Sequence, residues 1–177
     1  MNKVYLIANN KFLYSKHFSC IKSTDIVCFC NHALHDSERF NTNKKFLFLK
    51  FHYEKIPSYK ISFGNRYKKT FFILSLKIRN LSQNQKIQSL FRNFKDNKNI
   101  CKISNVINLN EYSTKKPQPT TGFVAFHKLK KKFPNKEIIL IGFDGLNEQN
   151  NQFWHKHDYD FEQNYYKINN IKNISAL

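Results

Sequence analysis

The sequence has no stretch of about 20 consecutive apolar residues, the length that a helix needs to cross a membrane. The apolar segment that begins at Val4 is too short for the hydrophobic region of a secretory signal, and no convincing cleavage site follows it. We therefore expect a cytoplasmic protein in which this first apolar segment forms a β-strand.

Several familiar binding motifs are also missing. No CxxC pair or Cys/His spacing of a zinc site occurs, and no Asp-x-Asp pair accompanies Asp144. Neither GxGxxG nor a P-loop is present, which excludes the common loops for dinucleotides and nucleoside triphosphates. We expect no metal ion and no resident cofactor. Buried, reduced thiols are predicted for all four cysteines: Cys20, Cys28, Cys30 and Cys101.

Acidic residues are scarce. The chain has 12 Asp and Glu against 30 Lys and Arg, which gives a formal net charge of +18 at pH 7. Such a charge favours polyanionic partners: nucleic acid, anionic lipid headgroups or phosphorylated glycans. The abundant Lys, Asn, Ile and Phe share AT-rich codons, so genome composition accounts for part of this charge. Charge alone leaves a nucleic-acid partner and a merely solvated basic surface both open.

The chain does contain the material for a packed core. Of its 177 residues, 41% are hydrophobic and 16% aromatic, enough burial to offset the entropy lost on folding. No internal repeat and no linker divides the sequence. We expect one domain over residues 1–177.

Strand-like and helix-like segments alternate along the chain. Apolar runs predict strands at residues 4–8, 25–31, 45–53, 70–76, 103–109 and 137–143. Helical spacing and capping signals predict helices at residues 83–94, from Thr120 or Thr121 to Pro134, and at 158–168. The polar stretch between the first two strands has room for a short helix. This alternation predicts an α/β fold: a single Rossmann-like domain with a mainly parallel sheet flanked by helices.

Polar side chains follow several predicted strands. Ligands bind beyond the carboxyl ends of the strands in such sheets. Asn9 and Asn10 follow the first strand, Asn31 follows the second, and Asp144 follows the last. Asn9 and Asn10 are equally typical of an ordinary turn. These four residues are our candidates for binding a ligand at that edge.

A second candidate lies where a helix is expected to begin. Thr120, Thr121 and Gly122 combine hydroxyl groups with the exposed backbone amides of a helix start, a combination that holds carboxylates and phosphates. An ordinary Thr cap explains the same residues. Both interpretations stay open from the residues alone.

Two histidines precede the last predicted helix. His155 and His157 have the spacing of a metal-binding pair in a strand, but no third ligand is evident nearby. Alternatively, one of them is a general base, because a helix N-terminus disfavours the protonated imidazole and keeps the ring able to accept a proton. A polar surface loop is the third interpretation.

The order of these motifs resembles that of bacterial sialyltransferases that use CMP-activated sialic acid. In that family a first strand leads into a loop with an Asn, and a second strand ends in Cys-Asn, as at Asn9 and Cys30-Asn31. A Thr-Ser-Gly-type turn then opens a helix, as at Thr120-Thr121-Gly122.

The second half of the chain continues the resemblance. A strand ends in Gly-x-Asp at Asp144, and a His precedes a helix at His157. The segment from His157 to Glu162 and the Pro-Thr-Thr-Gly turn are also similar to short motifs of animal sialyltransferases. The resemblance covers most of the chain in order and is dense at residues 1–31 and 119–165.

The resemblance implies a metal-independent, inverting glycosyltransferase. It implies a CMP-sugar as donor and a surface glycan, such as lipooligosaccharide or capsule, as acceptor. In this interpretation His157 is the base, with His155 as its substitute, and Asp144 positions the donor. The remaining donor-binding residues are then Asn9, Asn10, Asn31, Thr120, Thr121 and Gly122.

The basic charge predicts a further partner, an anionic membrane surface. It favours peripheral attachment to that surface, at the inner face of the cytoplasmic membrane. Two alternatives to the glycosyltransferase interpretation stay open. The main alternative is a basic nucleic-acid-binding module without enzymatic activity, although no recognisable motif for DNA or RNA occurs. A degenerate family member that serves as a scaffold is the third possibility.

Overall fold

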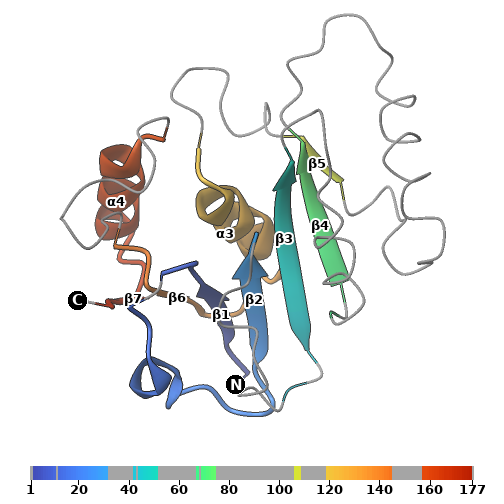
Figure 1. Ribbon diagram of the computed structural model, residues 1–177, viewed down its shortest axis with the longest axis vertical. Helices are drawn as coiled ribbons and strands as arrows, with labels where there is room; N and C mark the ends of the chain where they lie inside the picture. Colours follow the sequence, from blue (N-terminus) through green and yellow to red (C-terminus); the bar gives the residue numbers. More distant parts are fainter. Residues whose placement is uncertain are drawn as a thin grey trace, which may run out of the picture.

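The computed structural model describes residues 2–10, 12–31, 42, 44–51, 67, 69–74, 106–108, 119–144 and 157–176. These residues form a seven-stranded sheet in the order β5-β4-β3-β2-β1-β6-β7 (Figure 1). The strands are β1 (Val4–Ile7), β2 (Ile26–Cys30), β3 (Lys45–Phe51), β4 (Lys69–Leu74), β5 (Val106–Asn108), β6 (Ile138–Ile141) and β7 (Asn173–Ile174). Each neighbouring pair is parallel. The predicted α/β fold with a parallel sheet is confirmed.

The central strands are apolar because both of their faces are covered. Every residue of β1, β2 and β6 is buried, as expected for a parallel sheet between two layers. One face packs against helix α3 (Thr121–Lys132), whose Phe123, Val124 and Leu129 share a core with Leu6 and Cys28. Tyr166 of helix α4 (Tyr159–Ile168) joins this core.

The strand order reverses beside β1. The chain proceeds from β1 through β2, β3 and β4 to β5, and then returns to place β6 on the other side of β1. Val4 is in register with Ile26 of β2 and with Ile138 of β6. Such a reversal splays the loops at the carboxyl ends of the two strands apart, and that crevice is where doubly wound sheets bind ligands. In this chain it lies after β1 and β6.

Specific residues end the strands where the structure has them. Asn31 has φ 48° and Gly142 has φ 75°, so both leave the extended conformation directly after or near the end of a strand. At the start of β2, Asp25 accepts hydrogen bonds from the backbone N–H groups of Lys3 and Lys22, each 2.9 Å long. These features make β2 and β6 shorter than predicted.

Other predictions meet mixed outcomes. The expected short helix is a 3₁₀ turn, η1 (Ser15–Phe18), and the last two predicted helices are α3 and α4. The helix predicted at residues 83–94 lies outside the described residues. Strand β7 was not predicted, because its two residues carry no apolar run and their strand character comes from pairing with Leu140 and Ile141.

The cysteines divide by position. Cys28 and Cys30 are free, buried thiols, and burial raises the pKa of both, that of Cys30 to about 12. The prediction of buried, reduced thiols is therefore confirmed for these two. It is wrong for Cys20, which is exposed because it lies in the turn after η1. Cys101 lies outside the described residues.

Among the described residues, none of the helices is both long enough and apolar enough to span a membrane.

Candidate functional site

Asn10 joins the two strands at the point of reversal. It is 1% exposed, and its Nδ2 donates to the backbone carbonyl of Gly142 at 3.3 Å and to Oδ2 of Asp144 at 3.4 Å. Its Oδ1 accepts from the backbone N–H of Phe12 at 3.0 Å. The side chain therefore bridges the loops after β1 and β6. Its polar atoms hold the shape of this edge, and the adjacent Asn9 is half-buried.

Asp144 is the acceptor around which the loops are organised. Besides Asn10, it receives hydrogen bonds from Nδ2 of Asn173 at 3.2 Å and from the backbone N–H of Ala176 at 2.9 Å. Its carboxylate thus ties the loop after β6 to the loop after β1 and to the segment around β7. This agrees with a positioning role. Asn173 was not singled out in the sequence, because nothing local marks it as a partner of Asp144.

Gly122 permits a close contact at the start of α3. A Cβ atom at this position would lie 2.0 Å from Cε1 of Phe143, so only glycine lets the ring pack there. The backbone carbonyl of Phe143 in turn accepts from Nε2 of Gln163 at 2.5 Å. Gly122 therefore sets the distance between α3 and the loop after β6. This explains the glycine by packing, beside its predicted donor-binding role.

Asn31 and Thr121 connect the end of β2 to the start of α3. Nδ2 of Asn31 donates to Oγ1 of Thr121 at 3.1 Å. The left-handed backbone of Asn31 at φ 48° turns its side chain toward the helix instead of continuing the strand. Thr121 is 6% exposed and Asn31 is half-buried, so the pair lies largely within the carboxyl edge, one strand away from the reversal between β1 and β6.

Thr120 is the N-cap of α3 and is held by Glu162 of α4. Its Oγ1 accepts from the backbone N–H of Phe123 at 3.0 Å. Its own backbone N–H and hydroxyl donate to the two carboxylate oxygens of Glu162, at 2.6 and 2.7 Å. Glu162 is 3% exposed, so a buried negative charge sits at the positive end of the α3 dipole.

The hydrogen bonds between Thr120 and Glu162 affect how the Thr-Thr-Gly turn could bind a ligand. A ligand carboxylate at Thr120 would have to displace the carboxylate of Glu162. Thr121, whose partner is the neutral Asn31, requires no such displacement. Glu162 was noted only as part of a short motif, and its spacing from His157 was the signal that could have identified it as a site residue.

The start of α4 brings His157 to the same edge. Asp158 caps the helix by accepting from the backbone N–H of Phe161 at 2.9 Å. His157 lies directly before this cap, half-buried, and its ring meets that of Tyr159 edge-on at 5.9 Å between centroids. Because Glu162 lies about one turn into the same helix and reaches Thr120, the first turn of α4 is anchored beside the start of α3. His155 lies outside the described residues.

A cluster of aromatic rings from α3, α4 and the loop after β6 packs beside the Thr120–Glu162 contact. The rings of Tyr165 and Tyr166 pack edge-on or tilted against Phe123 at 5.2 and 5.9 Å, and Phe143 lies 6.4 Å from Tyr166. Burial, followed by the charge of Glu162, raises the pKa of the Tyr166 hydroxyl, so this group stays neutral. The cluster packs α3, α4 and the loop after β6 together beside the Thr120–Glu162 contact.

In the part of the chain that the structure describes, no three His, Cys, Asp or Glu side chains gather closely enough to hold an ion. The carboxylate of Asp144 already accepts three hydrogen bonds from protein groups. The predicted residues that do gather at the carboxyl edge are Asn9, Asn10, Asn31, Thr120, Thr121, Gly122, Asp144 and His157.

Comparison with known proteins adds no family to this description. No model of a known protein family matches the chain. No curated protein matches it significantly either.

Proposed function

We propose that this protein is an inverting glycosyltransferase that moves sialic acid, or a related sugar, from a CMP-sugar to a glycan. The main support is that Asn9, Asn31 and Thr121 lie at the carboxyl edge of a parallel sheet, with His157 on the same edge. The order of these residues along the chain is the order of the motifs in the sialyltransferases that the sequence resembles.

In this proposal the chain's own groups divide the work. Asn9 and the Asn31–Thr121 pair hold the donor by hydrogen bonds to its nucleotide and its sugar carboxylate. The acceptor hydroxyl loses its proton to the imidazole of His157 and forms a bond to the anomeric carbon. The bond from that carbon to the phosphate oxygen breaks, and CMP leaves with the electron pair. Such a base contributes about 10²–10⁴-fold to the rate.

Three further residues have supporting roles. Asp144 and Asn10 fix the loops after β6 and β1 through their mutual hydrogen bond, which keeps Asn9 in place. Glu162 fixes Thr120, and with it the first turn of α3 where Thr121 lies. The proposed acceptor is a surface glycan under assembly, and the proposed location is the inner face of the cytoplasmic membrane.

Nucleotide binding tests the proposal before any acceptor is known. We expect CMP to raise the melting temperature, with UDP, GDP and ATP as comparisons and with EDTA making no difference. At 100 times its Kd a ligand stabilises by about 2.7 kcal/mol, which for a chain of this size shifts Tm by roughly 5–10 °C. A shift with UDP and none with CMP would exclude the sialyl-type donor.

Two variants locate the bound nucleotide sugar. Thr121→Val keeps the shape of the side chain and removes its hydroxyl. Asn31→Gly removes the amide and still permits the left-handed backbone at this position. Both should weaken binding of a CMP-sugar about tenfold, the cost of roughly one lost hydrogen bond. Thr24→Val, at an exposed position in the turn before β2 at the opposite edge of the sheet, serves as the matched control and should leave binding unchanged.

A further inference from the structure

Lysines gather along the edge of the sheet opposite to the candidate site. Lys3 precedes β1, Lys22 lies in the turn before β2, Lys44 precedes β3, and Lys136 precedes β6. Because α3 runs antiparallel to the strands, its last turn, Lys130–Lys132, ends on the same side. We call these residues the lysine edge.

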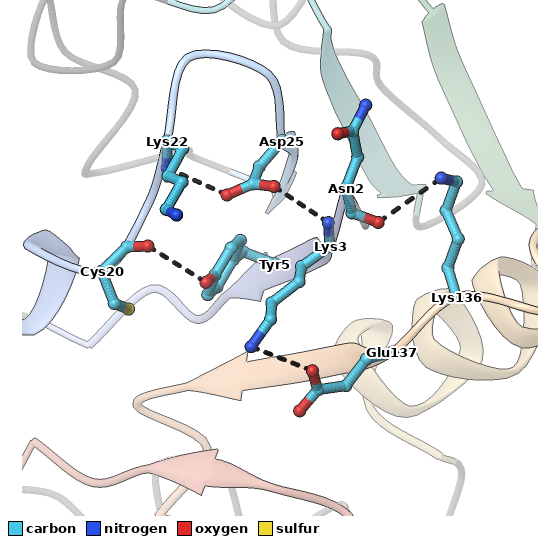
Figure 2. A network of polar contacts seen from close by, with 8 residues as sticks. All are labelled: Asn2, Lys3, Tyr5, Cys20, Lys22, Asp25, Lys136 and Glu137. Atoms are coloured by element: carbon cyan, nitrogen blue, oxygen red, sulfur yellow. Dashed lines mark hydrogen bonds and ion pairs between the residues drawn. The ribbon is translucent and has the colours of Figure 1, made fainter.

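The members of the lysine edge are joined by short contacts (Figure 2). Nζ of Lys136 donates to the backbone carbonyl of Asn2 at 3.4 Å, and the backbone N–H groups of Lys3 and Lys22 share the carboxylate of Asp25. Outside that view, Nζ of Lys44 donates to the carbonyl of Thr24 at 3.3 Å. These contacts place Lys3, Lys22 and Lys136 beside the starts of β1, β2 and β6.

The acidic groups described here do not neutralise the lysine edge. Asp25 is 3% exposed, and its carboxylate accepts hydrogen bonds from two backbone N–H groups. Glu137 forms an ion pair of 3.0 Å with Lys3. The side chains of Lys22, Lys130, Lys131 and Lys132 are exposed, so this edge keeps an excess of positive charge.

We infer that the lysine edge docks on an anionic lipid bilayer. The described positive charges along it are lysines, compact point charges that suit the diffuse field of lipid headgroups. The starts of β3, β2, β1 and β6 lie side by side over about 14 Å, at about 4.8 Å per strand, and present a broad front to a flat partner.

An exposed aliphatic residue adds a second reason to choose a bilayer. Ile168 ends α4 and is 78% exposed. Since α4 connects the carboxyl end of β6 to the start of β7, its last residue lies toward the same side as the lysine edge, between Lys167 and Lys172 in the sequence. An aliphatic side chain beside lysines suits the headgroup boundary of a membrane, whereas single-stranded nucleic acid is held by aromatic stacking. Docking in this way leaves the carboxyl edge facing solution.

Vesicle cosedimentation tests the inference with the full chain. We expect binding to vesicles of phosphatidylcholine mixed with phosphatidylglycerol at low salt, its loss at high salt, and no binding to phosphatidylcholine alone. Replacing Lys130, Lys131 and Lys132 together by Gln should weaken binding about 100-fold, at about fivefold per lysine. The matched variant with Arg at the same three positions should keep it. If the triple Gln variant binds anionic vesicles within a few-fold of the wild type, the inference is overturned.

Ile168→Ser separates a bilayer from nucleic acid. It should weaken vesicle binding about three- to tenfold and leave binding of single-stranded RNA unchanged. If the protein binds RNA more tightly than vesicles at equal salt, and Ile168→Ser affects neither, the partner is a nucleic acid and the inference is wrong. The inference rests on the membrane location proposed above and not on the transfer reaction. CMP binding and vesicle binding can therefore fail independently.

Discussion

The two edges of the sheet have opposite chemistry although the same strands form them. At the carboxyl edge the polar side chains are buried or half-buried and bonded in pairs: Asn10 with Asp144, after β1 and β6, and Thr120 with Glu162, between α3 and α4. At the amino edge, charged side chains point outward and their contacts are mainly to backbone groups. Hydrogen-bonded polar side chains hold the groups of a binding site at fixed distances, whereas separate surface charges create an electrostatic potential that attracts an oppositely charged partner. We assign chemistry to the first edge and docking to the second.

The largest expected effect tests whether the carboxyl edge is catalytic. His157→Ala should lower the rate of sugar transfer by about 10²-fold or more, because a sugar hydroxyl is a poor nucleophile without a proton acceptor. CMP affinity should stay within a few-fold, because the base faces the acceptor. The measurement is a steady-state transfer assay beside a binding isotherm.

His155→Ala is the matched control for that experiment and should have a smaller effect. An inactive His155→Ala protein together with an active His157→Ala protein would move the catalytic assignment by two residues. Full activity of both variants would show that neither histidine is the catalytic base.

The next effect tests whether the polar contacts of the carboxyl edge are structural as well. Glu162→Ala removes the buried acceptor of two hydrogen bonds from the half-buried Thr120 and leaves both donors without it. We expect a loss of about 2–3 kcal/mol in the free energy of unfolding, measured by urea denaturation. Asp160→Ala, two residues earlier on the exposed side of α4, should cost about 0.5 kcal/mol through the helix dipole. Equal losses in the free energy of unfolding for the two variants would show that the Glu162–Thr120 hydrogen bonds do not stabilise the fold.

A smaller effect concerns the packing beneath the same edge. Gly122→Ala forces a Cβ against the ring of Phe143. We expect a loss of about 1–2 kcal/mol by overpacking, which outweighs the gain of about 1 kcal/mol in helix propensity. Phe143→Leu should relieve the clash, so the double variant should be more stable than the two single losses added together. Strict additivity in urea denaturation would show that Gly122 and Phe143 are not in contact.

The smallest effect lies between the two edges, in the middle of α3. His127 packs against the rings of Phe123, Phe126 and Tyr165, and burial lowers its pKa below the ordinary value of 6.5. The unfolded chain then binds the proton more readily than the folded one. The stability associated with neutral His127 is present above pH 6.5 and is lost as the pH falls through the lowered pKa.

Denaturation of the wild type and of His127→Gln across that range measures this term. The stability of the wild type should fall relative to that of the variant between about pH 7 and pH 5. Both proteins share the other titrating groups, so their difference isolates His127. A constant difference across the range would show that the ring is as well solvated in the folded state as in the unfolded one.

The strands that the structure describes were largely predictable, because their apolar runs are a local property of the sequence. A strand that is covered on both faces must be apolar throughout. The residues Leu6, Cys28 and Leu140 are buried in such strands, and the same apolar runs identified these strands in the sequence. The start of α3 was also predictable to within one residue, since Thr120 or Thr121 had the chemistry of a cap, and the structure selects Thr120. Residues 83–94 give no outcome because they lie outside the described part of the chain.

The candidate site was only partly predictable. Asn10, Asn31, Thr121 and Asp144 stand out because they follow strands or begin a helix, and in a parallel sheet those positions converge at one edge. Which of them meet was not predictable: Asn10 reaches Asp144 across 134 residues, and Asn31 reaches Thr121 across 90. A hydrogen bond between distant residues leaves no periodicity in the sequence.

The sequence by itself therefore determined the α/β class, the positive charge and the kinds of side chain that follow each strand. These depend on composition and on spacing over a few residues. The tertiary structure alone decided that β6 lies beside β1, that Glu162 occupies the start of α3, and that Asn173 makes β7 a strand and a support for Asp144. Those outcomes depend on how helices and strands far apart in the chain pack together, because only packing determines which polar groups are buried side by side.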